Sequence, residues 1–547
     1  MALAKVSTPS LAMSCSGLQA PHIPEAEVLW ITSNPVQNFE YPAVVDVSGQ
    51  TPPSLAGDIP PLTFCNVSIA LAHPGENDTS FISVWLPPTE QWNHRYTATG
   101  GGGIAAGYDF NMVSPLASGF AASSTDGGLT LNHTVNPQTG LWGVNDDGSL
   151  DEGRLTNLGW RSIHDMSLAS KDLIRQFYDQ DPNYSYWAGC SQGGRQGYAA
   201  AAKYPHDFDG ILAIAPALGI EYVGPAAFWP VVVMHNEGEF VPSCVLEKFQ
   251  AALVDTCDPL DGATDGLISD YDLLTTCSGS FNASALIGQS VSCPQTGTNS
   301  SITITPRHAK IVTKILDGPR DASGTQYWFG TAPGANFSGV AGTVYENGRW
   351  IPKPFAPAAG WLKNVVSPLT RAADITAMSY DEYFAAFNKS VELASPFLGE
   401  EYLGLEAFRT AGGKLLTWVG LADQYIPPSH ALQFHDRVSG EIGGDSGVDD
   451  FYRLFTAPGV GHCAGGNGPQ PLGAMAALVQ WVENGIAPRV LHAKGEDEVG
   501  REMERELCLY PKKLVYRQGD VTRMASFGCE EPERRNAKSC VFALIEV

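Results

Sequence analysis

The segment YWAGCSQGGRQG, residues 186–197, places Ser191 at the centre of a Gly-x-Ser-x-Gly motif. This motif is typical of a sharp strand-to-helix turn that exposes the serine hydroxyl. The flanking sequence favours that setting, because residues 185–188 predict a buried strand, residues 194–203 a helix and residues 210–216 a second buried strand. We therefore expect an α/β fold, specifically an α/β-hydrolase core. The alternative is an ordinary glycine-rich turn without chemistry.

A serine hydroxyl needs an adjacent base, and that base needs a group that orients it. In the α/β-hydrolase order, an acidic residue and then a histidine follow the serine, each on a loop after a core strand. Residues 413–420 predict one such strand, with Asp423 after it, and residues 451–456 predict the next, with His462 after it. The sequence predicts Ser191 as nucleophile, His462 as base and Asp423 as orienter.

A cysteine lies next to each of the two reacting residues, Cys190 before the serine and Cys463 after the histidine. A bridge between them would hold their Cα atoms within roughly 4.4–6.8 Å, and so bring nucleophile and base together. Two alternatives stay open: Cys190 could itself be a thiolate nucleophile, and the aspartate could be a plain turn residue. His164 and His430 are interpreted as structural or surface residues.

An oxyanion hole needs two N–H donors, one from the residue after the nucleophile and one from a loop after an earlier strand. The first donor is predicted to be Gln192. Residues 95–99 predict the earlier strand, and residues 100–107 (GGGGIAAG) form the loop, in which Gly101 or Gly102 is the expected donor. A phosphate cradle lacks the following Lys and Ser/Thr of a P-loop. A merely flexible loop remains the other interpretation.

The paired cysteines flanking Ser191 and His462, together with Asp423, resemble the triad of the tannase and feruloyl esterase family. The likeness covers most of the chain, roughly Thr63 to Cys529, and is strongest in residues 186–216, 420–428 (GLADQYIPP) and 458–463 (PGVGHC). It implies secreted enzymes that cleave phenolic esters of plant material, with the serine, histidine and aspartate in the roles given above. It also implies the disulfides Cys190–Cys463, Cys508–Cys529 and Cys15–Cys65.

An acidic loop, CDPLDGATDGLISD at residues 257–270, concentrates oxygen ligands of the kind that calcium prefers. It is not an EF-hand, because no glutamate occupies the last position of that motif. The resemblance implies a structural calcium site whose ligands are the side chains of Asp258, Asp261 and Asp265 and the carbonyls of Ala263 and Leu267. A pair of Asp-Gly turns without metal is the alternative. No organic cofactor is expected.

Ser191 and Asp423 lie 232 positions apart, too far for the few βα units that separate these loops in a minimal hydrolase. A large insertion rich in Pro, Gly, Ser and Thr is therefore predicted between them as a lid, with aromatic side chains that stack on a phenolic acyl group. The predicted organisation is an N-terminal extension and core edge (1–60), a discontinuous catalytic domain (61–219 and 403–530), the lid with the calcium site (220–402) and a tail (531–547).

Charge and cysteines bear on partners and compartment. Acidic residues outnumber basic ones by 58 to 33, and no basic patch is visible, so nucleic acid is not an expected partner. No stretch is long and apolar enough to span a membrane. Eleven cysteines and several Asn-x-Ser/Thr sequons favour a secretory route, with Cys540 as the candidate free thiol. Secretion is thus expected, although Met1 to Cys15 lack an apolar signal-peptide core.

The predicted function is a secreted serine ester hydrolase that cleaves feruloyl, cinnamoyl or galloyl esters through an acyl-enzyme intermediate. The expected partners are small phenolic esters or feruloylated polysaccharide. Alternatives are a galloyl-specific tannase, a general aromatic carboxylesterase, and a catalytically silent, calcium-stabilised binder of phenolic or cell-wall ligands. The sequence does not choose between galloyl and feruloyl specificity, because the acyl pocket is not readable from it, and it leaves the oligomeric state open.

Overall fold

The computed structural model describes residues 15–40, 59–296, 300–367, 374–399, 404–497 and 499–532. Most of the predicted tail, with Cys540, and residues 1–14 lie outside the described residues, as does position 403, where the second catalytic segment was expected to begin.

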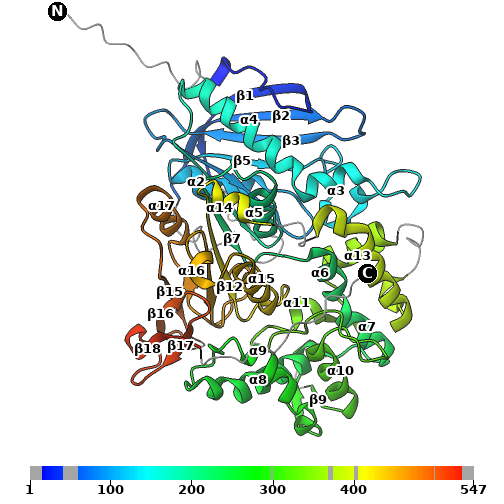
Figure 1. Ribbon diagram of the computed structural model, residues 1–547. Helices are drawn as coiled ribbons and strands as arrows, with labels where there is room; N and C mark the ends of the chain where they lie inside the picture. The colour runs from blue at the N-terminus through cyan, green and yellow to red at the C-terminus, as the bar shows by residue number, and fades with distance from the viewer. Residues whose placement is uncertain are drawn as a thin grey trace, which may run out of the picture.

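A nine-stranded sheet forms the centre of the described molecule, in the order β1-β2-β3-β5-β4-β6-β7-β12-β13 (Figure 1). The strands from β1 to β5 pair antiparallel, and those from β5 through β4 to β13 pair parallel. Their bounds are β1 (Glu27–Phe39), β2 (Leu62–Ala72), β3 (Ser80–Leu86), β4 (Arg95–Thr99), β5 (Ala121–Thr125), β6 (Tyr184–Cys190), β7 (Gly210–Ile214), β12 (Lys414–Gly420) and β13 (Tyr452–Ala457). The strands predicted before the glycine loop, the serine, the aspartate and the histidine are confirmed.

Helices cover both faces of the parallel part of the sheet, which explains why its strands are continuous apolar runs. On one face α4 (Arg161–Tyr178), α5 (Gln192–Lys203) and α15 (Pro428–Glu441) bury side chains such as Leu173, Tyr198 and Phe434 against the strands. On the other face α17 (Ala474–Asn484) buries Leu478 and Trp481. Because all parallel strands end at the same edge, the loops after β4, β6, β12 and β13 meet there.

The segment between β7 and β12 adds no strand to the described nine-stranded sheet; it forms helices and two small hairpins, seen in green and yellow-green in Figure 1. Its buried core is shared with Ile104, Trp142 and Leu155 of the catalytic part of the chain. The domain boundaries expected at residues 220 and 402 stay a prediction. The elements are α6 (Ile220–Ala226), α7 (Trp229–Asn236), α8 (Ser243–Cys257), α9 (Leu273–Ser280), β8 (Ser290–Ser292), β9 (Ser301–Thr303), α10 (Pro306–Asp317), α11 (Ser338–Ala341), β10 (Thr343–Glu346), β11 (Arg349–Pro352), α12 (Ala356–Gly360), α13 (Tyr380–Leu398) and α14 (Glu406–Thr410).

Five disulfides join the described cysteines: Cys15–Cys65, Cys190–Cys463, Cys244–Cys293, Cys257–Cys277 and Cys508–Cys529. The three pairings that the family resemblance implied are confirmed. The other two tie together parts of the inserted segment, and the sequence did not predict them because spacing alone does not determine connectivity. The disulfide Cys508–Cys529 joins β16 (Glu502–Cys508) to β18 (Phe527–Glu530). The remaining strands of this region are β14 (Gln470–Pro471), β15 (Val490–Glu496) and β17 (Lys513–Tyr516).

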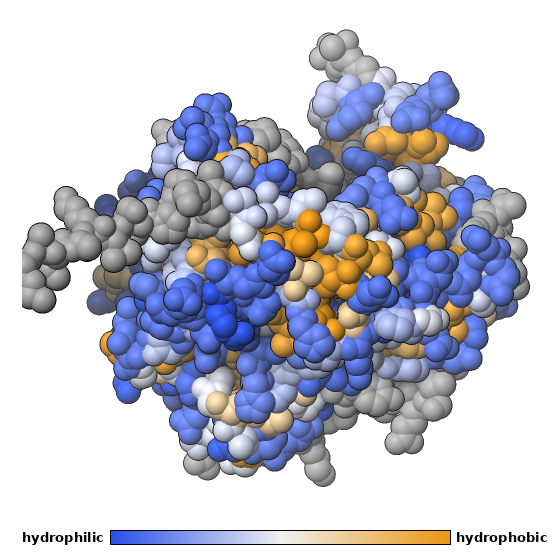
Figure 2. All heavy atoms as spheres, turned by 90° about the horizontal axis from the view of Figure 1, so that it is seen from above, coloured by the Kyte–Doolittle hydropathy of each residue, from blue (hydrophilic) through white to orange (hydrophobic). Residues whose placement is uncertain are grey.

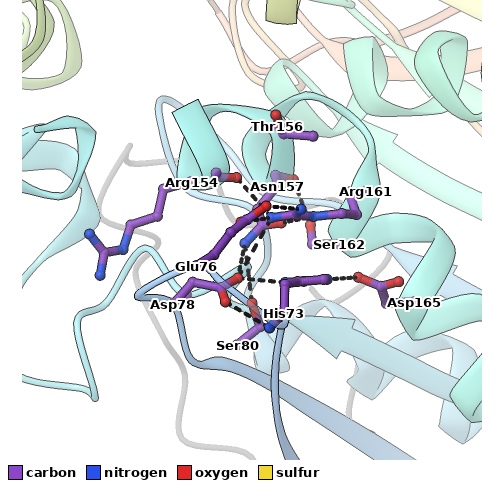
Figure 3. Close-up of polar contacts among 12 residues, drawn as sticks. His73, Glu76, Asp78, Ser80, Arg154, Thr156, Asn157, Arg161, Ser162 and Asp165 are labelled. Atoms are coloured by element: carbon purple, nitrogen blue, oxygen red, sulfur yellow. Dashed lines mark hydrogen bonds and ion pairs between the residues drawn. The ribbon is translucent and has the colours of Figure 1, made fainter. Parts of the chain in front are cut away.

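His73, a buried residue in the turn between β2 and β3, links the antiparallel end of the sheet to α3 (Glu152–Gly159) and α4 (Figure 3). Its Nδ1 lies 2.6 Å from Asp78, and its Nε2 lies 3.2 Å from Asp165 on α4. Asn157 on α3 donates a 2.9 Å hydrogen bond to Asp78. Burial disfavours the charged imidazole, but the two carboxylates outweigh it and raise the pKa of His73 to about 9. This histidine is therefore a charged cross-link at neutral pH.

The edge strand β1 leaves two large apolar side chains on the surface, Leu29 at 48% and Trp30 at 44% exposure. Figure 2 shows the molecule from this end, with an apolar patch surrounded by hydrophilic residues. No helix among the described residues combines the length and the apolarity needed to cross a bilayer.

Candidate active site

Ser191 occupies a strained turn between β6 and α5. Its backbone has φ 62° and ψ −123°, a conformation that non-glycine residues rarely adopt. The turn is held on both sides, because the Ser191 N–H donates to the Ile214 carbonyl (2.9 Å) and the Ser191 carbonyl accepts from the Ala217 N–H (3.0 Å). Strain that the surrounding structure over-determines in this way is common at functional sites. The turn has the strand-to-helix position and the strained backbone that the sequence predicts for a nucleophile elbow.

The glycines around the serine are required by close backbone approach. A Cβ on Gly189 would lie 2.5 Å from the backbone of Gly193, and a Cβ on Gly193 would lie 2.9 Å from the Gly101 carbonyl oxygen. A Cβ on Gly100 would in turn lie 2.5 Å from the Cα of Gly193. The elbow and the glycine loop after β4 are therefore in direct backbone contact.

The aspartate and the histidine meet across the loops after β12 and β13. The Nδ1 of His462 lies 2.7 Å from the Oδ2 of Asp423, and both side chains are buried. The other carboxylate oxygen accepts hydrogen bonds from the N–H groups of Tyr425 (2.9 Å) and Ile426 (2.8 Å), so the carboxylate cannot rotate freely. Gln424 accepts from the backbone N–H of His462 (3.0 Å). This arrangement commits Nδ1 to the aspartate and leaves Nε2 for another partner.

The disulfide between Cys190 and Cys463 joins the elbow to the histidine loop, with 5.8 Å between its Cα atoms. A ring nitrogen of His462 lies within 4.8 Å of both sulfur atoms. The covalent link thus fixes the backbone next to Ser191 against the backbone next to His462. Because both sulfurs are bonded to each other, neither is a thiolate, and the alternative of a Cys190 nucleophile is wrong for this structure.

The two candidate glycine donors differ in what their N–H groups do. The Gly101 N–H donates to Oε1 of Gln196 (3.0 Å) and is therefore engaged. The Gly101 carbonyl accepts from the Gly193 N–H (3.0 Å) at the start of α5. Of the two glycines, Gly101 is therefore the one whose N–H already has a side-chain acceptor.

Side chains that the sequence analysis did not single out hold this loop in place. Gln138 accepts from the Ile104 N–H (3.0 Å) and donates to the Gly102 carbonyl (2.8 Å) and to Tyr108 Oη (2.7 Å). Gln196 donates to the Ala106 carbonyl (2.9 Å), in addition to accepting from the loop. Gln196 lies five residues after the nucleophile on α5 and could have been suspected; nothing in the local sequence of Gln138 indicates its contact.

The other predicted donor, Gln192, begins α5 directly after the serine. Its side chain is buried; Oε1 accepts from the Arg195 guanidinium (2.8 Å) and Nε2 donates to the Leu158 carbonyl (3.3 Å). Arg195 also donates to that carbonyl (2.8 Å). Burial lowers the pKa of this arginine to about 10, so it stays charged at neutral pH. The Gln192 side chain is thereby held by two direct hydrogen bonds, and Arg195 and the Leu158 carbonyl are themselves hydrogen-bonded.

A pocket that is partly open to solvent has Ser191 in its lining. Much of its wall comes from the inserted segment, including Ile220 and Val223 of α6. Phe355 and Tyr425 are stacked with 4.4 Å between ring centroids, and Tyr425 also lies edge-on to the histidine. Ser191 therefore lies in the wall of a largely aromatic and aliphatic space.

In the acidic loop after α8, backbone N–H groups of the loop hold two of the three carboxylates. Asp258 accepts from the N–H groups of Asp265 and Gly266, and Asp261 accepts from those of Ala263 and Ser269. Burial raises the pKa of Asp261 to about 7. The buried Arg505 guanidinium lies 2.7 Å from Asp265 and offsets one of the three charges. An oxygen-only set with surplus negative charge fits a hard cation such as calcium.

Known proteins resemble this chain in both sequence and structure. A family model described as Tannase and feruloyl esterase matches residues 65–530. A probable feruloyl esterase of Arthroderma benhamiae is 38% identical over 523 residues, covering 94% of this chain and 93% of the relative. Tannin acyl hydrolase from Aspergillus niger superimposes with a TM-score of 0.81 at 25% identity (96% and 97% covered), and feruloyl esterase B from Aspergillus oryzae with 0.72 at 26% (95% and 100%), which confirms the α/β-hydrolase core. The chain therefore belongs to the tannase and feruloyl esterase family of carboxylic ester hydrolases.

Proposed function

We propose that this protein hydrolyses phenolic esters by two-step acyl transfer, with Ser191 as the nucleophile. The observation that carries the proposal is the buried His462–Asp423 hydrogen bond, covalently linked to the strained serine turn through Cys190–Cys463. A serine, an oriented imidazole and a carboxylate are the parts that acyl transfer needs.

In the first step His462 takes the Ser191 proton while the serine oxygen bonds to the ester carbonyl carbon. The tetrahedral intermediate collapses, the imidazolium returns the proton to the leaving alkoxide, and the alcohol departs. In the second step the imidazole takes a proton from water as its oxygen attacks the acyl carbon. The bond to the Ser191 oxygen then breaks, the imidazolium returns the proton to that oxygen, and the acid is released. Asp423 holds the productive tautomer and stabilises the imidazolium. The N–H groups of Gln192 and Gly102 are the proposed oxyanion donors.

The proposed substrates are esters of aromatic acids, either small molecules or feruloyl groups on polysaccharide. Support comes from the aromatic and aliphatic cavity at the serine and from relatives named feruloyl esterase and tannin acyl hydrolase. Secretion is part of the proposal. It is supported by the five disulfides, because such bonds persist in oxidising compartments.

A structural calcium ion is the proposed occupant of the acidic loop. The ligands would be the carboxylates of Asp258, Asp261 and Asp265 and the carbonyls of Ala263 and Leu267. The ion would supply charge neutralisation and no chemistry at the ester. The competing interpretation is a metal-free pair of turns held by the N–H contacts and by Arg505.

The decisive experiment compares the native enzyme with Ser191→Ala. The variant should fold normally by circular dichroism and lose at least about 10³-fold in kcat on methyl ferulate. A fluorophosphonate should label the native protein and leave the variant unlabelled. Near-native turnover by the variant, or labelling at another residue, would refute the assignment. An inert native protein would instead favour the binder alternative.

A further inference from the structure

Arg195 lies one helical turn after the nucleophile, on α5, and only 1% of it is exposed. Its guanidinium donates to three neutral oxygen atoms: the side-chain oxygen of Gln192 (2.8 Å), the Leu158 carbonyl (2.8 Å) and the Gly159 carbonyl (3.1 Å). The two carbonyls belong to the last residues of α3, where a helix has no acceptor-satisfying N–H groups of its own and favours a cation. Arg195 therefore fastens the start of α5 to the end of α3.

The same contacts reach Gln192, the residue that follows the nucleophile. Its side chain accepts from Arg195 and also donates to the Leu158 carbonyl (3.3 Å). The backbone N–H of Arg195 donates to the Ser191 carbonyl (3.0 Å) and so closes the first turn of α5. The first N–H groups of a helix have no acceptor within the helix. Contacts from outside the helix, those of the Gln192 side chain among them, therefore orient this residue.

The anchor on α3 is itself held by the inserted segment. A Cβ on Gly159 would lie 2.6 Å from the Phe397 carbonyl oxygen of α13, so the end of α3 is in close backbone contact with that helix. Glu221 of α6 is buried as well, and its charge favours the charged form of Arg195. Because α6 also lines the pocket beside Ser191, the guanidinium links the serine turn to the elements around that pocket.

Burial of this guanidinium is unfavourable, because it lowers the pKa of Arg195 to about 10. Replacing a buried ionic group by apolar side chains of similar volume is often neutral or stabilising. A planar guanidinium instead supplies several directed hydrogen bonds in a fixed geometry. These bonds all act on the first turn of α5 and on the helix end that faces it, which indicates a role in placing that turn.

We propose, building on the function above, that Arg195 is a positioning residue for ester hydrolysis. It holds the first turn of α5 so that the Gln192 N–H is directed at the oxygen that becomes charged in the tetrahedral intermediate. A misdirected donor stabilises this oxygen less well. The ester ground state does not depend on the donor, so loss of the guanidinium should lower kcat much more than it changes KM.

The test compares the native enzyme with Arg195→Met and Arg195→Lys in the hydrolysis of methyl p-coumarate, with folding followed by circular dichroism and thermal melting. Methionine removes every side-chain hydrogen bond, whereas lysine keeps the charge and some of the donors. Arg95→Met is the matched control. Arg95 donates two hydrogen bonds to Glu483 (2.6 and 2.7 Å) and begins β4, at the opposite end of that strand from the glycine loop.

Arg195→Met should lose at least about tenfold in kcat, with the 10²–10³-fold loss of a whole oxyanion donor as the upper limit. KM should change less than about threefold. Inactivation by a fluorophosphonate should slow by a similar factor to kcat, because its attack by the serine also develops charge on an oxygen in the oxyanion hole. Arg195→Lys should recover part of the loss. Arg95→Met should melt at a lower temperature and keep the native kcat.

A folded Arg195→Met enzyme with kcat within threefold of native, or with its loss confined to KM or to the melting temperature, would overturn the positioning role and leave the proposed function intact. A native protein that neither hydrolyses the ester nor reacts with the fluorophosphonate would refute the proposed function. If Arg195→Met does not fold, Gln192→Met decides, because it removes the contacts of the Gln192 side chain with Arg195 and Leu158. The same kcat-selective loss is expected there, and an unchanged kcat overturns the inference.

Discussion

The carboxamide of Gln138 is the part of the structure whose removal should be most informative. Gln138 is not one of the reacting residues. It links two parts of the glycine loop, because it accepts a hydrogen bond from the Ile104 N–H (3.0 Å) and donates one to the Gly102 carbonyl (2.8 Å). Gln138→Met keeps the length of the side chain and removes both contacts. The serine, the histidine and the aspartate are untouched by this change.

Besides the bond to Tyr108, Gln138→Met removes two neutral hydrogen bonds to Ile104 and Gly102, worth about 1 kcal/mol each, so the conformation of the loop is less stable by about 2 kcal/mol. If this fixation acts mainly in the transition state, kcat falls by roughly 30-fold. Complete loss of an oxyanion donor costs about 10²–10³-fold in kcat and is the upper limit. KM should change less than about threefold, because the ground-state ester does not depend on the oxyanion donor.

The assay is steady-state hydrolysis of methyl p-coumarate, with folding checked by circular dichroism and thermal melting. Tyr108→Phe is the matched control, because it removes a hydroxyl that contacts Gln138 (2.7 Å) and the Gly102 carbonyl (3.2 Å) while leaving the glutamine contacts to the loop. It should lose only a few-fold in kcat. A folded Gln138→Met enzyme with unchanged kcat, or with the loss confined to KM, would refute a positioning role at the oxyanion loop.

Three further changes test other parts of the structure. The folded-state pKa of His73 is raised from 6.5 to about 9, so the stability that its charged form contributes is complete below pH 6.5 and is lost as pH rises through 9. His73→Gln should therefore lower the free energy of unfolding, measured with denaturant, by about 2 kcal/mol at pH 6 and much less at pH 9.5. Chelation should lower the melting temperature, and calcium should restore it; an unchanged melting curve together with no calcium by elemental analysis argues for metal-free turns. The double variant Cys190→Ser/Cys463→Ser should stay folded at reduced temperature yet lose kcat by at least tenfold, since the serine and histidine loops are then joined only by packing; full activity would show that the link is dispensable.

The local architecture of the reaction centre could be predicted because short-range physics determines it. Only glycines tolerate the backbone crowding on either side of Ser191. Parallel strands covered on both faces must be apolar throughout, so the strands before Asp423 and His462 were visible as runs of buried residues. The order of these residues along the chain was then enough to place them at one edge of the sheet.

The choice between Gly101 and Gly102 could not be made from the sequence, because chemically identical N–H groups differ only in which distant side chain reaches them. Gln138 lies in a short turn that no periodic pattern in the sequence predicts. The pairings Cys244–Cys293 and Cys257–Cys277 were open for the same reason.

By itself, then, the sequence determined the strands, the strained serine turn and the order of the reacting residues. Only the tertiary structure decided that the Gly101 N–H is engaged by Gln196, and that the residues lining the pocket beside the serine are mostly aromatic and aliphatic. The wall of that pocket joins α6 to Phe355, Trp361, Tyr425 and Ile426. Periodicity reports whether a side chain is buried, whereas the contacts of a buried side chain depend on how remote segments pack together.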